Sequence, residues 1–436
     1  MSPTFIVPPL RVVRLAALPL LLGLMGTGAA LAETFVEKTD RLLSEPSWTR
    51  SASTVQPSDG TSIGPEKNAW VPRVSLNPGS GPSLRGLDAG LSGRINPRLG
   101  SLGVNQLITD FGTSDARAKA VERNADKHKR EEALLRQNLL FSAVEAQLLL
   151  VRAIASVHSA QQLERNVQRQ TSTDGSETAA SVADDAQASA RLAAAKLRTV
   201  EAERVHEQAV DRYAAVFGSP PPSHETQDGL AAPIDWLPKT ADELDRLAAD
   251  DGNPDIAAAA ARTEASIAQR AVQRARESMP RIDLQAGSIR REGIDSTRGA
   301  ASERKLLLRL AWSFDVGLSA ADLTEVADQA VAAALDQEEV VRLQAREEGR
   351  AAWAAWVAAG ERARRFVHDQ SSADVALRLA RLDCAVQRCP TPALLDAEFH
   401  LFNAKSDAAD ARIDEVLAAY RVLRVAGRMS QAMFSV

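Results

Sequence analysis

The sequence predicts a mainly α-helical fold with membrane β-strands, in which a strand pair followed by a long helical hairpin occurs twice. One observation is a repeat with a nearly constant offset, since Pro72 and Pro280 lie 208 positions apart in similar surroundings. Another is the run over 114–171, which contains neither proline nor glycine. The third is strand-like alternation of apolar and polar residues before each long run. A duplication on this scale implies two copies of one supersecondary unit, which pack together or against further copies.

Residues 1–32 are expected to form a secretory signal peptide. They carry Arg11 and Arg14, then an apolar run over 15–25, and end in a small-x-small cleavage pattern at Ala32. An uncleaved membrane anchor is the alternative, but the apolar run is well short of the ~20 residues that a span needs. No cysteine follows this run, so we expect an exported chain without a lipid anchor.

The composition argues against several classes of function. A net charge of −5 does not favour nucleic-acid binding, which requires a basic patch. The 6 histidines show no ligand spacing, and 2 cysteines without a paired histidine motif do not make a zinc site. No nucleophile elbow or phosphate-binding loop is present in the sequence. We therefore expect no catalytic residue, no metal, no cofactor and no nucleic-acid partner.

The first structural repeat is expected over 33–217. The prolines and glycines between 46 and 71 predict an irregular segment there. Strands are expected at about 84–109, where an apolar set alternates with a small or polar one: Leu87, Ala89 and Leu91 against Asp88, Gly90 and Ser92. Long helices with a coiled-coil-like apolar stripe are expected at about 114–171 and 177–216. The first of them would be on the order of 85 Å long, which no ordinary globular domain needs.

A proline-rich linker is expected over 218–252, and the second structural repeat over 253–436. Its strands are expected at about 281–314, where one face carries the clearest apolar series of the chain: Leu306, Leu308, Leu310, Trp312 and Phe314. Its long helices are expected at about 319–382 and 393–425. The repeat thus has the same plan as the first.

The alternation in these strands leaves two interpretations open. A membrane barrel strand requires an apolar face toward lipid and a polar one toward water, and a half-buried strand of a soluble sheet looks the same. Four strands cannot close a membrane barrel, since even the smallest needs about eight, and open strand edges are not tolerated in lipid. If these are membrane strands, several chains must share one barrel.

Several sequence runs resemble the motifs of the TolC-like family of outer-membrane efflux and type I secretion channels. The segment 253–284 is similar to the helix that precedes a strand in that family. The other runs are QLITDFG at 106–112, ADDAQA at 183–188, SFDVG at 313–317 and LLDAEFHLFNAK at 394–405. The motifs occur in the family's order and spacing over essentially the whole mature chain.

The resemblance implies a fold and a set of partners. It implies a homotrimer that shares a β-barrel in outer-membrane lipid and continues as an α-helical barrel into the periplasm of a Gram-negative cell. Such a channel-tunnel passively conducts substrates in a tripartite efflux or type I secretion system. It docks through a periplasmic adaptor (membrane fusion) protein on an inner-membrane transporter, either ABC-type or proton-driven. The missing lipid-anchor cysteine favours the type I secretion branch.

The resemblance also assigns residues to the strand-to-helix junctions and to the pore. Asp110 and Gly112 match the first junction, and Asp315 and Gly317 match the second. Asp396 keeps one of the two positions that usually supply an acidic ring in the pore. The other position, Ala393, lacks the carboxylate. Because acidic rings attract cations, Asp396 is expected to influence selectivity, with a solvated surface aspartate as the alternative.

At the expected periplasmic tip, the sequence departs from the family pattern. Cys384 and Cys389 occupy positions where the family often has a tyrosine and an arginine that latch the closed aperture, and Asp184 matches their acidic partner. The usual latch therefore cannot operate. We hypothesise a disulfide between the two cysteines in the oxidising periplasm, which requires the backbone to turn between them. Two free thiols are the alternative.

Two other functions compete with a channel. A periplasmic coiled-coil adaptor would share the signal peptide and the helical hairpins. Adaptors, however, typically carry one hairpin flanked by lipoyl-like and barrel modules, whereas this sequence predicts two hairpins, each preceded by a strand pair. An exported enzyme has no residue constellation in its favour.

Overall fold

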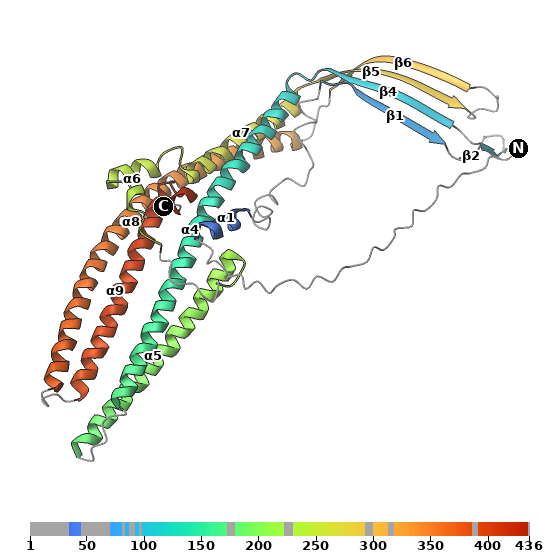
Figure 1. Cartoon of the computed structure of the whole chain (residues 1–436). Helices are drawn as coiled ribbons and strands as arrows, with labels where there is room; N and C mark the ends of the chain where they lie inside the picture. The colour runs from blue at the N-terminus through green and yellow to red at the C-terminus, as the bar shows by residue number, and fades with distance from the viewer. Residues whose placement is uncertain are drawn as a thin grey trace, which may run out of the picture.

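The computed structural model describes most of the helices and strands of the chain. The described residues are 35–44, 70–80, 83–86, 92–95, 98–171, 179–221, 230–292, 300–312, 318–385 and 391–434. The expected signal peptide and nearly all of the segment 46–71 lie outside these ranges. Figure 1 shows an elongated molecule with the strands at one end and the long helices extending away from them.

The strands form an antiparallel sheet of four, in the order β1-β4-β5-β6. Their bounds are Arg73–Ser80, Arg98–Thr109, Arg281–Glu292 and Ala300–Ala311. A second, two-stranded sheet of β2 (Ser83–Gly86) and β3 (Ser92–Ile95) lies in sequence between β1 and β4. β4 pairs with β5, which belongs to the other copy of the repeat, so the two strand pairs join into one sheet.

The first strand corrects the sequence-based expectation. It begins at Arg73, well before position 84, and the predicted series from Leu87 to Leu91 lies outside the described residues. The sequence signal is weak here because β1 has only two large apolar residues, Val74 and Leu76, and contains Pro78. Proline cannot donate a hydrogen bond to a sheet ladder and is therefore confined mainly to edge strands. β1 is such an edge strand, which is why it accommodates Pro78.

The long helices form two hairpins. α4 (Thr113–Thr171) and α5 (Ala179–Phe217) follow the first strand pair, and α8 (Leu318–Ala385) and α9 (Thr391–Val425) follow the second. Each helix ends within about three residues of the predicted boundaries, which is within the usual spread of helix assignments. The helices lie in the order α8, α9, α4, α5, so that α9 and α4 join the two hairpins (Figure 1).

Shorter elements lie around the C-terminal ends of α5 and α9. α7 (Pro254–Ser278) packs against both α4 and α8 and leads into β5. The others are α1 (Phe35–Ser44), η1 (Ile234–Trp236), α6 (Ala241–Ala248) and η2 (Gln431–Phe434). The buried Asn253 side chain connects α6, α7 and the end of α9. It accepts from the Asp255 amide and donates to the carbonyls of Ala248 (3.2 Å) and Val425 (2.8 Å). With Pro254 at the first helical position, Asn253 gives α7 a well-defined start.

The largest hydrophobic core lies at this level rather than along the rods. It joins α4, α5 and α9 to α1, α6 and η2 through buried residues that include Phe35, Leu150, Tyr213, Leu244, Tyr420 and Leu423. Burial raises the pKa of Tyr420 to about 12, and its hydroxyl donates to the Ala231 carbonyl at 3.2 Å. Toward the tip, the interhelical contacts form two smaller apolar clusters. One contains Leu163, Val167, Leu395 and Phe399, and the other contains Leu377 and Leu401.

One helix in the described part of the chain is long and apolar enough to cross a membrane. It is α4, in which an 18-residue window reaches a mean hydropathy of 1.6. The window is 44% buried within the chain itself, and its apolar side contributes Leu140, Val144, Leu148 and Leu150 to the main core. Packing against the neighbouring helices therefore accounts for the apolar character of α4.

Candidate functional site

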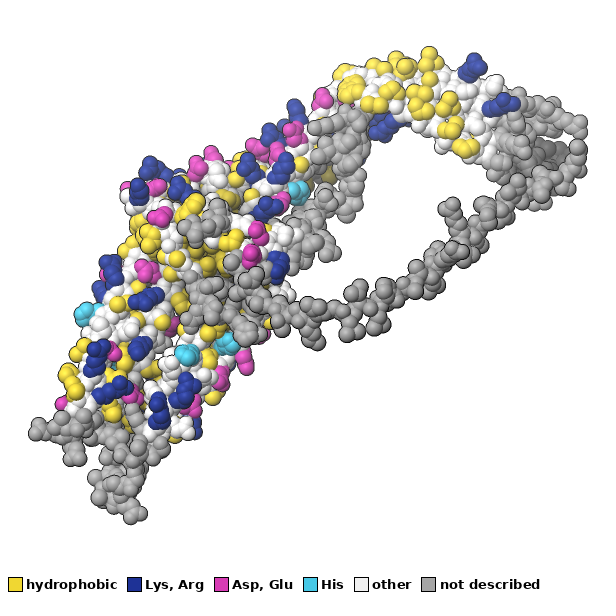
Figure 2. Space-filling model, viewed as in Figure 1, with side chains coloured by type: hydrophobic (Ala, Val, Ile, Leu, Met, Phe, Trp, Pro, Cys, Tyr) yellow, Lys and Arg dark blue, Asp and Glu magenta, His cyan; other side chains and the backbone are white. Residues whose placement is uncertain are grey.

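The four-stranded sheet has one apolar face, which the strand register defines. Residues paired across neighbouring strands lie on the same face. The register therefore places one apolar set together: Val74, Leu76, Leu102, Val104, Ile282, Leu284, Ala286, Leu306, Leu308 and Leu310. This apolar face is uncovered, with Leu306 and Leu308 each 71% exposed, and Figure 2 shows hydrophobic side chains along the outer side of the sheet. A contiguous apolar surface of this kind indicates a lipid or protein contact.

The opposite face of the sheet is polar and charged. Arg73, Asn105 and Gln285 lie on one rung of this polar face, and Asp283 and Arg309 are directly paired on the next rung. The Arg281 Nε donates to both carboxylate oxygens of Asp283, at 3.0 and 2.9 Å. Further along β6, the Lys305 ammonium lies 2.9 Å from Glu303. The sheet thus separates an apolar side from a polar one.

Both edges of this sheet lack a neighbouring strand in the described part of the chain. β1 and β6 each pair on one side only. Their outward backbone N–H and C=O groups are therefore available to another chain. In lipid, those groups must be paired, since no water is present to satisfy them.

Asp110 organises the turn from β4 into α4. Its side chain is 6% exposed, and its carboxylate accepts from the amides of Gly112 (3.3 Å) and Ser114 (2.8 Å) and from the Ser114 hydroxyl. The chain turns out of the strand through Phe111 and Gly112, with φ of 52° and 98°, a region that favours glycine. The Asp110 side chain thus binds amides that the first turn of a helix leaves without partners. The aspartate and glycine that the sequence assigned to this junction are therefore a structural cap and its turn.

The remaining predicted site residues are only partly described. Asp315, Gly317 and Cys389 lie outside the described residues. Asp184 lies in α5 and Cys384 near the end of α8, and the structure places their backbones but not their side chains. The disulfide hypothesis therefore stays a prediction.

Asp396 is described, and it is already paired. Its carboxylate accepts from the guanidinium of Arg191, which comes from α5 of the other hairpin. Seven residues further along both helices, Arg198 donates to Asn403 at 2.7 Å. In both pairs the partners are 205 positions apart, so the contact between the two helices repeats after one heptad. We call these contacts, with those of Arg152 below, the hairpin seam.

Aromatic rings reinforce the seam near the tip. The guanidinium groups of Arg191 and Arg198 lie over the Phe399 ring, 5.4 and 5.2 Å from its centroid. Arg198 also lies 5.3 Å from the centroid of Phe402. Each such contact at a partly exposed site contributes about 0.5–1 kcal/mol. Near their tips, the two hairpins are therefore held together by planar cations and rings beside a small apolar cluster of Leu163, Val167, Leu395 and Phe399.

Further from the tip, Arg152 of α4 continues the seam. Its Nε lies 3.2 Å from Asp410 Oδ1 without hydrogen-bonding geometry, its Nη2 donates to the Asp410 carbonyl at 3.0 Å, and it also pairs with Asp414. Burial raises the pKa of Asp410. The Arg152 charge opposes that rise, and the nearby Asp414 and Asp407 add to it. One arginine thus holds two carboxylates of α9.

Sequence reasoning missed the arginines of the seam. Arg191 and Arg198 are seven residues apart, as are Asp396, Asn403 and Asp410. Charged or polar residues at heptad spacing on two helices are the usual sign of pairing across a coiled coil. That spacing was the signal available in the sequence.

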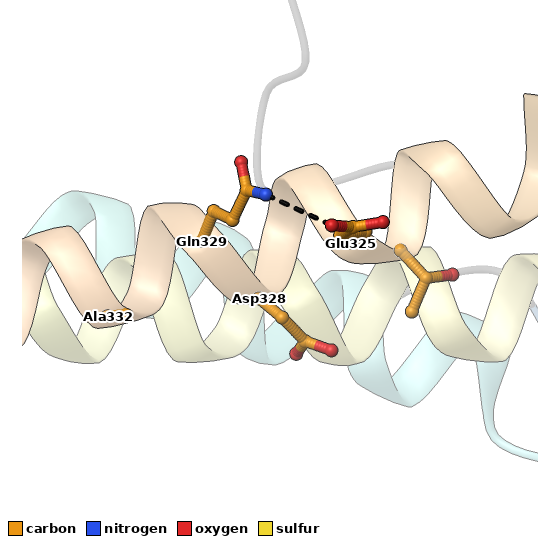
Figure 3. A pocket seen from close by; sticks show the side chains of 5 residues that line it. Glu325, Asp328, Gln329 and Ala332 are labelled. Carbon is orange, nitrogen blue, oxygen red and sulfur yellow. Dashed lines mark hydrogen bonds between the residues drawn. The ribbon is translucent and has the colours of Figure 1, made fainter.

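A shallow hollow on α8 is lined by Thr324, Glu325, Asp328, Gln329 and Ala332. In Figure 3, Gln329 points toward Glu325, with a hydrogen bond of 3.2 Å, while Asp328 points away. The Asp328 carboxylate accepts hydrogen bonds from the guanidinium groups of Arg270 and Arg274, both on α7. The two bonds from Arg274 are 2.9 and 3.0 Å long. The Asp328 carboxylate therefore holds α7 against α8. Within the described residues, no cluster of three or more histidine, cysteine or acidic side chains could hold a metal ion.

Comparisons with known proteins identify the fold. No protein-family model matches the sequence, and no curated protein sequence matches it. Solved structures do match. The open-state MtrE outer membrane channel of Neisseria gonorrhoeae has a TM-score of 0.75 at 18% identity, covering 91% of this chain and 89% of that one.

Two further channels show the same likeness. The CmeC outer membrane channel of Campylobacter jejuni has a TM-score of 0.74 at 13% identity, with 91% and 86% of the chains covered. The outer membrane protein VceC of Vibrio cholerae has a TM-score of 0.65 at 16% identity, with 90% and 95% covered. The chain therefore has the fold of these outer-membrane proteins over nine tenths of its length, which confirms the fold that the sequence resemblance implied.

Proposed function

We propose that this protein is the outer-membrane channel-tunnel of a tripartite efflux or type I secretion system. Three identical chains conduct substrates passively from the periplasmic side to the outside. The observation that carries the proposal is a four-stranded sheet with an uncovered apolar face and two unpaired edges, continuous with long helical hairpins. The fold shared with MtrE, CmeC and VceC supports it.

The number of strands that one chain contributes supports an assembly of three copies. One chain supplies four strands, about half of what the smallest membrane barrel needs. Pairing β1 of one copy with β6 of the next satisfies both open edges, and three copies give a closed barrel of about twelve strands. The apolar face then lies against lipid and the polar face lines the lumen.

The helices at the two ends of each row support the same closure. α5 exposes the apolar side chains of Leu197 and Val200. It also exposes Glu203 and Glu207, neither of which has a charged partner among the described residues. α8 exposes its own apolar and basic side chains, including Val357, Val375, Leu379, Arg362 and Arg365. The two outer helices thus both expose apolar side chains. Contact between α5 of one copy and α8 of the next would cover them.

The remaining parts of the proposal concern domain organisation and location. A signal peptide over 1–32 exports the chain, and two structural repeats, 33–217 and 253–436, flank the linker 218–252. The barrel lies in outer-membrane lipid and the hairpins extend into the periplasm of a Gram-negative cell. Their tips meet a periplasmic adaptor protein, which connects them to an inner-membrane transporter.

Two measurements on the detergent-extracted mature protein test the proposal. Light scattering coupled to size exclusion should give the mass of three chains. Single-channel recording in a planar bilayer should give uniform conductance steps. A folded monomer that is soluble without detergent and never conducts would contradict the channel and favour a periplasmic adaptor.

A further inference from the structure

We propose that the lumen of the barrel carries a positive field, so that the channel favours anionic solutes. The inference rests on the trimeric channel proposed above and adds the charge class of its cargo. It starts from the polar face of the sheet. Among the side chains described on that face, the basic ones are Arg73, Arg281, Lys305 and Arg309, and the acidic ones are Asp283 and Glu303. Each chain therefore contributes two excess positive charges, and three chains contribute six.

The pairing on this face decides which charges act on solutes. Asp283 is held by Arg281, and Glu303 by Lys305, so both carboxylates are occupied. Arg73 and Arg309 have no ion-pair partner within the described part of the chain, and both are exposed. Arg309 faces Asp283 across the β5–β6 ladder, but that carboxylate is the one that Arg281 already binds. The excess charge therefore resides mainly on Arg73 and Arg309.

These two arginines lie at the helix-proximal end of the barrel. Arg73 begins β1, and Arg309 is two residues from the end of β6. Their rungs are adjacent in the ladder, with Asn105 and Gln285 beside Arg73 and Leu107 and Asp283 beside Arg309. In a trimer they form a basic belt where the tunnel of helices opens into the barrel. Every solute that passes through the channel crosses this belt.

The size of the barrel allows the belt to act across the whole lumen. About twelve strands, spaced by about 4.8 Å and tilted by about 40°, give a circumference of roughly 75 Å and a backbone radius of roughly 12 Å. The arginine side chains reduce the distance to the axis further. The Debye length at 0.1 M salt is about 10 Å, so the field of the belt is only partly screened at the axis.

The carboxylates of the hairpin seam offset this field little, because each of them has an arginine partner. Asp396 is paired with Arg191, and Asp410 and Asp414 share Arg152. A potential of about one kT in the lumen would concentrate monovalent anions and deplete monovalent cations by about threefold each. The expected preference for chloride over potassium is therefore severalfold at low salt.

The experiment is the chloride-to-potassium permeability ratio of the full channel in asymmetric KCl. The wild-type ratio should exceed one severalfold near 0.1 M salt and approach one near 1 M, where the Debye length is about 3 Å. The double variant Arg73→Gln, Arg309→Gln should bring the low-salt ratio to one or below. Glu303→Gln, which removes a negative charge from the same face, should raise it.

Arg304→Gln is the matched control. Arg304 lies on β6 between Glu303 and Lys305, but pairs with Ser288 on the other face of the sheet. Its removal should leave the ratio unchanged. This inference would be overturned by a conducting channel that prefers potassium, or by one whose permeability ratio is unchanged in the Arg73 and Arg309 variant. Either result would leave the proposed channel function standing. A folded trimer that never conducts would overturn the proposed function and this inference with it.

Discussion

At the scale of single residues, a carboxylate has opposite roles in two places. The Asp110 carboxylate is buried and receives amide and hydroxyl hydrogen bonds from the chain segment that follows it. The Asp410 carboxylate is half-buried beside Asp414, and burial is the main influence on its pKa. The first position needs a negative charge or at least an acceptor. The second tolerates neutralisation, because Arg152 retains Asp414.

Removing the cap at Asp110 should loosen the start of α4. Asp110→Ala removes the acceptor for the Gly112 and Ser114 amides, and loss of a helix cap costs about 0.5–2 kcal/mol. Hydrogen exchange of these amides should therefore accelerate by up to roughly thirtyfold. Asp115→Asn is the control, since Asp115 is an exposed acid of the same first turn. Equal exchange in the two variants would contradict a capping role.

The pH dependence of the hairpin seam should follow Asp410. Burial raises its folded-state pKa above the ordinary value of 3.8, so the unfolded chain ionises first as the pH rises. Its contribution to stability is therefore complete below pH 3.8 and is lost as the pH rises through the raised pKa. Asp410→Asn, which is neutral throughout, should become more stable relative to wild type across that window.

The measurement is hydrogen exchange of α4 and α9 amides between about pH 4 and pH 7, corrected for the intrinsic pH dependence of exchange. Asp414→Asn is the comparison, because it removes a carboxylate that Arg152 binds by a charged hydrogen bond. It should destabilise the seam at neutral pH. If Asp410→Asn is the more damaging change, burial is not the dominant influence on Asp410.

At the scale of elements, the two hairpins are joined most lightly toward their tips. α5 and α9 come together there through Arg191, Arg198, Phe399 and Phe402, beside a small apolar cluster that includes Val167 and Leu395. Exposed ion pairs contribute about 0–1 kcal/mol, so the seam is held by several weak contacts rather than one strong contact. Because these contacts are individually weak, we expect the tips to be the part of the hairpin pair that separates most readily.

Charge reversal in the seam should separate the hairpins, and a charge swap should rejoin them. Arg191→Glu or Asp396→Arg alone places like charges together, which should cost about 1 kcal/mol, or about fivefold in the fraction of separated tips. The double variant restores an opposite-charge pair and should return toward wild type. Single-channel open probability and hydrogen exchange in α9 both report the change.

The same swap between Glu201 and Arg204 is the control. That ion pair lies within α5, is exposed and does not connect the hairpins. Neither single reversal there should alter open probability. Failure of the Arg191/Asp396 swap to restore wild-type behaviour would mean that the pair does not set the separation of the hairpins.

The cysteines of the second hairpin provide a further test at this scale. If Cys384 and Cys389 form a disulfide, a thiol count on unreduced mature protein should find no free thiol. Closing such a short loop requires the backbone to turn, because the Cα atoms must approach within about 7 Å. Two reactive thiols per chain would contradict the hypothesis.

At the scale of the whole molecule, adjacent residues of β6 should differ sharply in what they tolerate. Leu308 lies on the apolar face and Leu307 on the polar face. Arginine on the lipid side of a barrel costs about 2–4 kcal/mol near the membrane midplane, whereas the lumen is wet. Leu308→Arg should therefore reduce folding and insertion into lipid vesicles far more than Leu307→Arg. Equal tolerance of both changes would contradict a lipid-facing apolar face.

Much of the architecture was predictable because its signals are local and periodic. The helical run over 114–171 lacks proline and glycine, and the alternation from Leu306 to Trp312 is regular, so α4 and β6 occur where the sequence places them. β1 was misplaced because Pro78 and sparse apolar residues hide it, and only its place at the sheet edge explains them. Asp110 and Gly112 lie between β4 and α4.

The sequence by itself determined the repeated order of strand pair and helical hairpin, since hydrophobic period and helix-breaking residues are properties of neighbouring positions. Only the tertiary structure decided that β4 pairs with β5, that Arg191 meets Asp396, and that Arg73 and Arg309 share the polar face. These contacts join residues about 180 to 240 positions apart, whose proximity depends on how the two repeats pack. The sequence around a charged side chain does not specify which distant charge will pair with it. The tertiary structure decides that Asp396 is paired with an arginine, and that Arg73 and Arg309 have no ion-pair partner in the described part of the chain.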